Sequence, residues 1–307
     1  MFLNINVLHN KILAHLGLLI ANLIYALNYT LAKDVMPEYI QPSGFILLRV
    51  IGGVFLFGLS YSLFIQEKIN KPDLLLFGIC GFFGVAVNQL LFFEGLNLTT
   101  PINAAIIMTS TPILVILLST FILNESITLR KILGIFLGLF GAVILILNGG
   151  DFTTNTNYMQ GNFFILMNAT SYAFYLVLIK PLMLKYHPIT VMTLVFSFGL
   201  IFVFPFGLEE LFIIEWEIMP EKIVLKILFV VICTTFFAYL FNSAALKYVM
   251  PSTVSIYIYL QPLFATVIAV LLQSDRLDSI KIISSLFIFL GIYLVSFKPQ
   301  KKKYNLF

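Results

Sequence analysis

Apolar residues form ten long runs along this chain, and short polar or basic segments separate them. A helix that spans a membrane needs about 20 mostly apolar residues, which is close to the length of most of these runs. Segments with charged, Asn or Pro residues mark the turns between them. The pattern predicts an all-α membrane protein with ten transmembrane helices, at Ile12–Ala32, Gly44–Ile65, Leu74–Leu96, Ile102–Leu123, Ile132–Leu147, Asn162–Ile179, Ile189–Leu208, Leu225–Leu246, Thr253–Leu272 and Ile280–Phe297.

The composition disagrees with most classes of soluble protein. Of the 307 residues, 60% are hydrophobic and 10% are charged, and the mean hydropathy is +1.03. Soluble domains have about 45–50% apolar and about 25% charged residues. The composition therefore argues against a soluble enzyme, a nucleic-acid-binding protein and a disordered scaffold. The net charge of +4 needs no nucleic-acid partner, because basic loops orient membrane proteins. The lipid bilayer is the expected surrounding.

The distribution of basic residues predicts the orientation, because cytoplasmic loops are enriched in Lys and Arg. With ten spans, both termini lie on one side of the membrane. That side would carry 12 of the 18 basic residues, and the other side would carry 5, with Arg49 inside a span. Both termini are therefore predicted to be cytoplasmic, in a multi-pass protein of a bacterial cytoplasmic (inner) membrane, and residues 298–307 form a basic cytoplasmic tail.

An internal repeat divides the chain into two units of five spans. Residues 88–147 align without gaps onto 238–297, so that Pro101 matches Pro251 and Pro112 matches Pro262. In the earlier helices, Lys33 matches Lys180 at an offset of 147. An odd number of spans per unit inverts the second copy, which predicts an inverted 5+5 repeat with units 12–147 and 161–297 and a linker at 148–160. Inverted repeats are typical of secondary transporters, although a duplicated channel or a membrane scaffold is an alternative.

The repeat motifs resemble those of the drug/metabolite transporter superfamily, and specifically its ten-helix EamA-like carriers with two EamA repeats. In the first repeat the resemblance rests on YALNYTLAK (25–33), an Arg in the second span (Arg49), GLNLTTPINAAIIMTSTPILVILLSTFILNE (95–125) and GIFLGLFGAVILI (134–146). In the second it rests on NATSYAFYLVLIK (168–180), ALKYVMPSTVSIYIYLQPLFATVIAVLLQSD (245–275) and FLGIYLVS (289–296). The second repeat departs from this pattern, since it has no counterpart of Arg49 and closes its fourth helix with Asp275 rather than Glu.

The resemblance implies a bundle with a central cavity, lined mainly by the third, fourth, eighth and ninth helices. It also implies alternating access and the export of amino acids or other small metabolites. Two charged residues lie inside spans, and each has two interpretations. Arg49 is either a carboxylate or gating partner of the substrate, or a structural partner of backbone carbonyls or a nearby carboxylate. Glu94 is either a proton-coupling group or an interfacial carboxylate.

Neutral polar side chains form a mirrored pattern in the fourth and ninth helices. Spaced at 100° per residue, Asn103, Ser110 and Thr111 fall on one arc, and Thr253, Tyr257 and Gln261 fall on the corresponding arc of the second copy. A shared cavity would produce this pattern, as would interhelical hydrogen bonding by small polar residues. Pro112 and Pro262 are predicted helix kinks, each of which frees a backbone carbonyl one turn earlier.

Further substrate-binding candidates come from four other helices. They are Asn88 and Gln89 in the third span, Tyr239 and Asn242 in the eighth, and the matching pair Tyr25 and Tyr172 in the first and sixth, with Asn22, Asn168 and Tyr175 close to them in sequence. No nucleotide-binding, metal-ligand or catalytic motif is found, so we expect neither a cofactor, nor a metal, nor enzymatic activity.

These observations predict a secondary transporter that exports small metabolites such as amino acids by alternating access. The expected partners are a small-molecule substrate and the bilayer, with no nucleic acid, and the sequence is compatible with a monomer. Two alternatives belong to other classes of protein. A non-transporting scaffold or receptor would leave the mirrored polar pattern without a role, and an intramembrane lipid-modifying enzyme would need a catalytic cluster that the sequence does not contain.

Overall fold

The structure is a computed structural model that describes residues 2–65, 67–149, 156–271 and 279–296. Every predicted span corresponds to helical structure, and the described residues contain no β-strand. Residues 150–155 of the predicted linker, the basic tail 298–307 and Asp275 lie outside the described residues. The chain is therefore an all-helical membrane protein, as the apolar pattern predicts.

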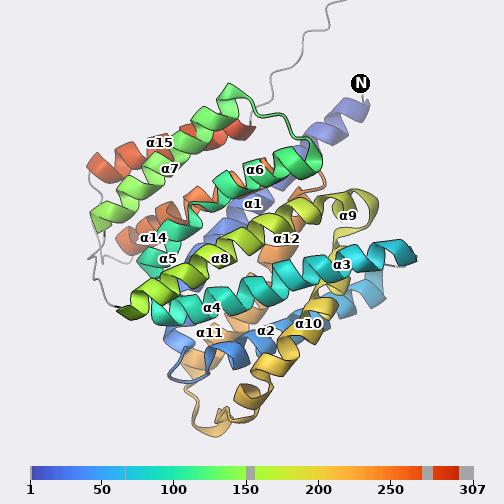
Figure 1. Ribbon diagram of the computed structural model, residues 1–307, viewed down its shortest axis with the longest axis vertical. Helices are drawn as coiled ribbons and strands as arrows, with labels where there is room; N and C mark the ends of the chain where they lie inside the picture. Colours follow the sequence, from blue (N-terminus) through green and yellow to red (C-terminus); the bar gives the residue numbers. More distant parts are fainter. Residues whose placement is uncertain (1, 66, 150–155, 272–278, 297–307) are drawn as a thin grey trace, which may run out of the picture.

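The first repeat contains five spans (Figure 1). The first two are single helices, α1 (Phe2–Val35) and α2 (Pro42–Phe64). The third combines a 3-10 turn (Lys71–Asp73), α3 (Leu74–Gly81), a π-helical segment (Phe82–Val87) and α4 (Asn88–Leu98). The fourth consists of α5 (Pro101–Met108) and α6 (Thr111–Leu123), and the fifth is α7 (Leu129–Gly149).

The second repeat has the same organisation. It begins with α8 (Thr156–Leu178), its continuation α9 (Lys180–Lys185), and α10 (Pro188–Phe212). After a 3-10 turn (Trp216–Ile218), the eighth span consists of α11 (Glu221–Phe229), a π-helical segment (Val230–Ala238) and α12 (Tyr239–Ala245). The ninth consists of α13 (Pro251–Ile256), a 3-10 turn (Tyr257–Tyr259) and α14 (Leu260–Leu271), and the tenth is α15 (Ser279–Ser296).

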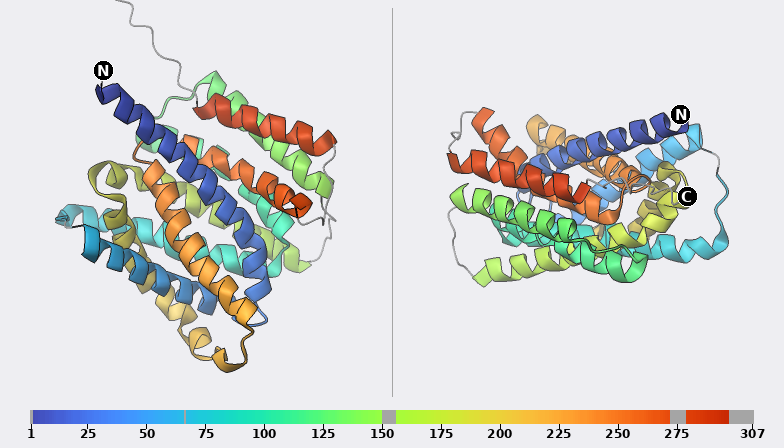
Figure 2. Two further views of the ribbon diagram at one scale, coloured as in Figure 1. Left: turned by 180° about the vertical axis from the view of Figure 1, so that it is seen from behind. Right: turned by 90° about the horizontal axis from the view of Figure 1, so that it is seen from above.

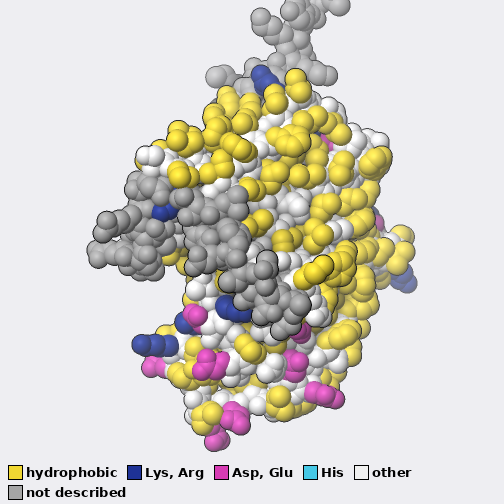
Figure 3. Space-filling model, turned by 60° about the vertical axis from the view of Figure 1, so that its left-hand side comes forward, with side chains coloured by type: hydrophobic (Ala, Val, Ile, Leu, Met, Phe, Trp, Pro, Cys, Tyr) yellow, Lys and Arg dark blue, Asp and Glu magenta, His cyan; other side chains and the backbone are white. Residues whose placement is uncertain are grey.

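Nine of these spans are long and apolar enough to cross a membrane within the part of the chain that the structure describes. The remaining span, α7, is a helix of 21 residues that packs against α15. Large apolar side chains such as Phe121 and Phe212, each 80% exposed, lie on the outside of the bundle. Figure 3 shows one face covered largely by hydrophobic side chains, with acidic and basic side chains gathered at its lower end. Lipid is the solvent that such a surface requires.

Local sequence explains where several helices begin and end. Pro42, Pro101, Pro188 and Pro251 each occupy the first turn of a helix, where the missing N–H group is not needed. The Thr100 side chain accepts a hydrogen bond from the Asn103 N–H and so caps α5. At its other end, the fourth span stops at Asn124, which has a left-handed conformation (φ 51°).

The two repeats pack around a pseudo-two-fold relation. Equivalent helices contact each other at the two edges of the molecule, α2 with α10 and α7 with α15 (Figures 1 and 2). At Gly291, an added Cβ atom would lie 2.5 Å from the carbonyl oxygen of Gly134, so the helices α7 and α15 approach closely because both residues lack side chains.

Between these edges, six spans form two groups that each mix helices of both repeats. The α8 group consists of α3–α4, α5–α6 and α8–α9, because α4, α5 and α6 all pack on α8. The α1 group consists of α1, α11–α12 and α13–α14, because α11, α12 and α14 all pack on α1. The inverted repeat relates one group to the other, which is the arrangement expected of two exchangeable halves.

Candidate functional site

A cavity lies between the α1 group and the α8 group, with an empty volume of about 630 Å³ that includes the open space at its mouth. The α1 group supplies residues from α1, the eighth span and the ninth span, and the α8 group supplies residues from the third, fourth and sixth spans, while α2 adds Arg49. The lining residues are Asn22, Tyr25, Asn28, Tyr29, Arg49, Asn88, Gln89, Phe92, Phe93, Met108, Asn168, Tyr172, Thr234, Tyr239, Asn242, Ile258 and Gln261.

Arg49 is the charged group of this cavity. It is 2% exposed, its Nε donates a hydrogen bond to the Thr235 hydroxyl at 3.0 Å, and its guanidinium carbon lies 4.4 Å from the centre of the Phe93 ring. Its Nη1 is buried and has no hydrogen-bond partner among the described residues. The lining contains no carboxylate in the described part of the chain, so the positive charge faces neutral amides, hydroxyls and aromatic rings. A buried cation without a counter-charge is costly.

Tyr239 joins the two halves of the site. Its hydroxyl donates to Asn88 Oδ1 at 3.1 Å and accepts from Gln89 Nε2 at 3.4 Å, which connects the eighth span to the third. Asn168 of α8 donates from Nδ2 to the Asn88 carbonyl at 2.6 Å. A short hydrogen bond from Asn242 Nδ2 to the Tyr172 hydroxyl joins the same two groups of helices. These side chains hold the polar wall of the cavity in a defined geometry.

The α1 group contains a second polar chain. The Tyr29 hydroxyl donates to Gln261 Oε1 at 3.1 Å, and Gln261 Nε2 donates to Asn22 Oδ1 at 2.9 Å. Asn22 in turn donates from Nδ2 to the Leu18 carbonyl at 2.8 Å. Gln261 therefore lines the cavity with both ends of its amide engaged.

Several buried polar atoms of the lining have no hydrogen-bond partner in the described structure. In addition to Arg49 Nη1, they are Thr234 Oγ1 and the amide oxygens Asn28 Oδ1, Gln89 Oε1 and Asn168 Oδ1. Unsatisfied buried groups of this kind are rare in proteins and are expected where a ligand or water completes the hydrogen bonding. The cavity thus offers a cationic donor and a hydroxyl for an anionic group, and amide oxygens for an N–H donor.

Many of the residues predicted from sequence meet in this cavity: Tyr25, Arg49, Asn88, Gln89, Tyr172, Tyr239, Asn242 and Gln261. The lining also contains Asn28, Tyr29 and Thr234, which the sequence analysis did not select. Asn28 and Tyr29 follow Tyr25 within the motif YALNYTLAK, one turn further along the same helix. This spacing places them on the same face as Tyr25, so the sequence could have indicated them. Thr234 lies in a π-helical segment. Because this segment departs from the α-helical periodicity, the side of the helix on which Thr234 lies could not be predicted from its spacing.

The mirrored polar pattern of the fourth and ninth spans is divided by the structure. Gln261 lines the cavity, whereas Asn103, Ser110, Thr111, Thr253 and Tyr257 are absent from its lining. The predicted arc assumed that each span is one continuous α-helix. In the fourth span, however, α5 ends at Met108 and α6 begins at Thr111. In the ninth span, the 3-10 turn Tyr257–Tyr259 comes directly before α14, which contains Gln261. Each break rotates the residues after it relative to those before it.

Three of the residues outside the lining, Asn103, Ser110 and Tyr257, make local or interhelical hydrogen bonds through their side chains. Asn103 donates from Nδ2 to Thr99 Oγ1 at 3.3 Å, and Ser110 donates to the Ile107 carbonyl at 2.7 Å. Tyr257 is hydrogen-bonded through its hydroxyl to His15 Nδ1 at 2.7 Å. Thr111 and Thr253 are buried, and the Thr111 hydroxyl has no hydrogen-bond partner among the described residues. Of these contacts, that of Tyr257 with His15 joins two spans, whereas those of Asn103 and Ser110 are local.

Glu94 also lies outside the lining of the cavity, next to the first turn of α2. Its carboxylate accepts a hydrogen bond from the Ser43 hydroxyl at 2.9 Å, while Glu210 accepts one from the Gly44 N–H at 2.7 Å. Two half-buried carboxylates therefore surround the first turn of α2, where the helix dipole favours negative charge. No group of three His, Cys, Asp or Glu side chains suited to a metal ion occurs among the residues that the structure describes.

An inverted repeat of helices around a central polar cavity defines a membrane transporter. The chain belongs to the EamA-like transporter family, which it matches over residues 12–147 and 159–297. It is 26% identical over 290 residues to an uncharacterized transporter of Archaeoglobus fulgidus, covering 94% of this chain and 98% of that protein. It is also 26% identical over 241 residues to the uncharacterized transporter YyaM of Bacillus subtilis, covering 78% of each.

Two further comparisons extend these findings. The WAT1-related protein At3g18200 of Arabidopsis thaliana is 25% identical over 307 residues, covering 91% of this chain and 77% of that protein. A solved crystal structure superposes with a TM-score of 0.72 at 17% identity, covering 94% of this chain and 96% of that one. At this identity the superposition shows the fold alone. The helices of this chain are therefore arranged as in a solved protein structure.

Proposed function

We propose that this chain is a secondary transporter that exports small zwitterionic metabolites of the amino-acid type by alternating access. The observation that carries the proposal is the buried Arg49, whose Nη1 is unpartnered in the described structure and whose cavity has no described carboxylate. A substrate carboxylate supplies the missing counter-charge, and bidentate or charge-assisted contacts with guanidinium groups are among the strongest polar contacts in proteins.

The opposite charge of a zwitterion has suitable acceptors in the same cavity. Asn28 Oδ1, Gln89 Oε1 and Asn168 Oδ1 are buried amide oxygens without a partner among the described residues, and an ammonium group donates three hydrogen bonds. A cationic metabolite would face Arg49 with no compensating carboxylate. Neutral amides around a single arginine therefore favour a molecule with a carboxylate and an N–H donor over a simple amine.

The direction of transport and the membrane are part of the proposal. Export follows from the resemblance to EamA-like carriers, and cytoplasmic termini follow from the 12 basic residues on the terminal side against 5 on the other. Two exchangeable helix groups around one cavity support alternating access, because each group corresponds to the other under the inverted repeat. The bacterial cytoplasmic membrane is the proposed location.

The test is a binding and transport comparison with matched probes. Purified protein in proteoliposomes is screened against the common amino acids, and each binder is compared with its decarboxylated amine and its deaminated acid, for example leucine with isopentylamine and 4-methylpentanoate. We expect the zwitterion to raise the melting temperature and to exchange across the membrane, and the amine to do neither. Binding of amines with no response to any amino acid would contradict the proposal.

A further inference from the structure

A pair of equivalent lysines connects the α1 group and the α8 group at opposite faces of the membrane. Lys33, at the end of α1, donates from Nζ to the carbonyl oxygens of Leu96 and Asn97 at 2.9 and 2.8 Å. These carbonyls belong to the last turn of α4, where backbone acceptors have no partner within the helix. The lysine therefore caps a helix of the other group, and its charge complements the negative end of that helix dipole.

Lys180 makes the same contact in the inverted copy. Its Nζ donates to the carbonyl oxygen of Val249 at 3.0 Å and, through a short hydrogen bond, to that of Leu246, at the end of α12. Lys33 Nζ also donates to the Thr99 carbonyl oxygen at 3.4 Å, and Leu246 and Val249 are the repeat equivalents of Leu96 and Thr99, since both offsets are 150. Lys33 belongs to the α1 group and reaches the α8 group, whereas Lys180 belongs to the α8 group and reaches the α1 group. Each lysine thus bridges the two groups, and the two bridges lie at opposite ends of the cavity.

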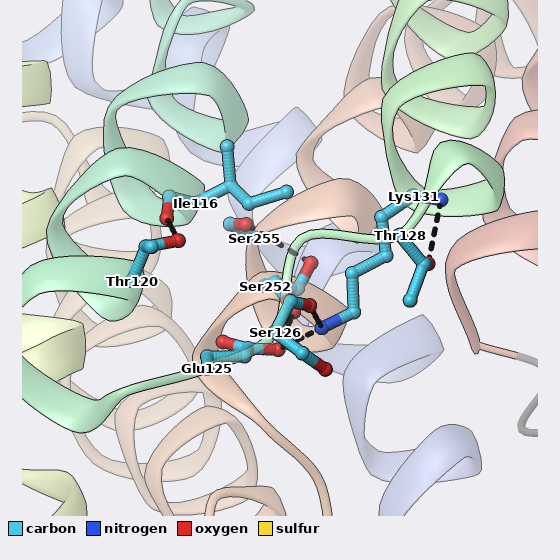
Figure 4. A network of polar contacts seen from close by, with 8 residues as sticks. All are labelled: Ile116, Thr120, Glu125, Ser126, Thr128, Lys131, Ser252 and Ser255. Carbon is cyan, nitrogen blue, oxygen red and sulfur yellow. Dashed lines mark hydrogen bonds and ion pairs between the residues drawn. The ribbon is translucent and has the colours of Figure 1, made fainter.

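A carboxylate reinforces the bridge at the face where α1 begins, here called the N face. Glu125, which follows α6 and is 5% exposed, accepts a short hydrogen bond from the Ser252 hydroxyl in the first turn of α13. Figure 4 shows that Lys131 approaches the same carboxylate from the start of α7, with its Nζ 2.7 Å from Glu125 Oε1. The repeat equivalent of Ser252 is Ile102, which has no hydroxyl group. The equivalent position at the opposite face therefore lacks this donor.

The contacts between the two helix groups are also more extensive at the N face than at the opposite face. At the N face α13 packs against α6, whereas the equivalent helices α5 and α14 form no comparable contact within the described residues. Tyr175 and Ser243 are hydrogen-bonded at 2.8 Å between the two groups, on the N-face side of the cavity. The N face is thus closed by several layers of contacts between the groups.

We propose that Lys33 and Lys180 are the two latches of the transport cycle, one for each face, and that Glu125 and Ser252 strengthen the N-face latch so that the carrier rests with its N face closed. This inference rests on the proposed alternating access. Opening either face must separate a helix group from the lysine that caps it, which breaks the hydrogen bonds between the ammonium group and the helix-end carbonyls. Substrate binding in the cavity has to offset that cost before the N face opens.

Two lysine ion pairs within single groups provide matched controls. Lys185 of α9 pairs with Asp73 at the start of the third span, and both belong to the α8 group at the N face. Lys226 of α11 pairs with Asp34 of α1 at 2.6 Å, and both belong to the α1 group at the opposite face. Because neither pair bridges the groups, neither should affect which face is closed.

The test measures the opening of each face without using transport. Spin-label distances are recorded by double electron–electron resonance in full-length protein in nanodiscs, with Cys80 and Cys233 replaced by alanine. One label pair replaces Ser126 and Lys247 at the N face, and the other replaces Asn97 and Lys222 at the opposite face, so that each pair has one label in each group. Lys180→Met combined with Ser252→Ala should raise the ratio of long to short N-face distances about tenfold, which corresponds to about 1.4 kcal/mol.

The other variants separate a latch from a general structural effect. Lys33→Met should lengthen the opposite-face distances and leave those of the N face unchanged, and Lys185→Met and Lys226→Met should change neither. If Lys180→Met does not fold, Ser252→Ala alone should raise the N-face ratio about threefold. Unchanged distances in folded Ser252→Ala and Lys33→Met proteins would overturn the proposal. If the distances shift as expected but the protein binds none of the amino-acid probes, the proposed substrate class would be overturned and the latches would stand.

Discussion

Gln89 and Tyr239, which occupy equivalent positions in the two repeats, are hydrogen-bonded to each other, with Gln89 Nε2 3.4 Å from the Tyr239 hydroxyl. Two residues related by a two-fold axis can meet only near that axis. Both also line the cavity, so the axis of the inverted repeat passes through the polar centre of the protein. A substrate held there contacts both halves of the transporter, which is the requirement for a site shared by two access states.

Tyr239→Phe should lower substrate affinity about five- to tenfold, because the change removes the hydroxyl that orders Asn88 and Gln89. A hydrogen bond between neutral groups contributes about 1 kcal/mol, so the loss in melting temperature should be small. Equilibrium binding of the best amino acid from the probe panel gives the affinity. The exposed Tyr248→Phe is the control and should bind as the wild type does.

Arg49→Met should weaken the affinity for a zwitterion about 100-fold, since charge-assisted hydrogen bonds contribute about 1.5–3 kcal/mol. The same change removes a buried cation that faces no described carboxylate, so the melting temperature of the protein without substrate should stay equal or rise. Calorimetry and binding are measured on one preparation. A large fall in melting temperature together with unchanged binding would assign Arg49 a structural role.

Gln261→Leu should lower transport several-fold, and Thr111→Val should not. Gln261 lines the cavity and is hydrogen-bonded to Tyr29 and Asn22, whereas Thr111 is buried outside the lining. Exchange of labelled substrate in proteoliposomes separates the two variants. Equal losses in both would support the continuous polar face predicted from sequence over the broken one in the structure.

Gly291→Ala should destabilise the protein by several degrees in melting temperature. Its Cβ atom would lie 2.5 Å from the Gly134 carbonyl oxygen, which forces α7 and α15 apart. Overpacking of this kind costs about 1–3 kcal/mol. Gly58→Ala is the matched control, because an added Cβ atom there meets nothing within 4 Å, and a helical Gly→Ala change is favourable by roughly 0.5–1 kcal/mol. Thermal unfolding in one detergent compares the two.

A reporter fused after Phe307 tests the orientation. Because the terminal side carries the excess of basic residues, an alkaline phosphatase fusion, which is active only in the periplasm, should remain inactive in cells. A fusion to green fluorescent protein at the same residue should fluoresce. Phosphatase activity with no fluorescence would reverse the assignment, and the N face would then be external.

The helices and the repeat could be predicted from the sequence because both depend on local information. The bilayer requires long apolar runs, and the offset of 150 between the copies is visible in pairs such as Pro112 and Pro262. Arg49, Gln89 and Tyr239 could be selected for a related reason, since polar groups inside the bilayer are costly and usually face the interior of a bundle.

The facing of the fourth and ninth spans could not be predicted in the same way. A helical wheel assumes a constant turn, but Thr109 and Ser110 interrupt the fourth span and Tyr257–Tyr259 form a 3-10 turn in the ninth. The π-helical segments Phe82–Val87 and Val230–Ala238 change the phase of the third and eighth spans as well. Such breaks are stabilised by contacts with other helices, which the local sequence does not contain.

By itself the sequence determined that this chain lies in a lipid bilayer, that it crosses the membrane in two inverted units, and that polar residues such as Arg49, Gln89 and Tyr239 lie within its spans. Only the tertiary structure decided that Asn28, Tyr29 and Thr234 join Arg49 at one cavity, while Ser110 and Thr111 are absent from its lining. It also decided that Lys33 and Lys180 each cap a helix of the opposite group. The reason is physical, because apolarity and repetition are properties of the chain, whereas the partner of a buried polar group depends on how separate helices pack.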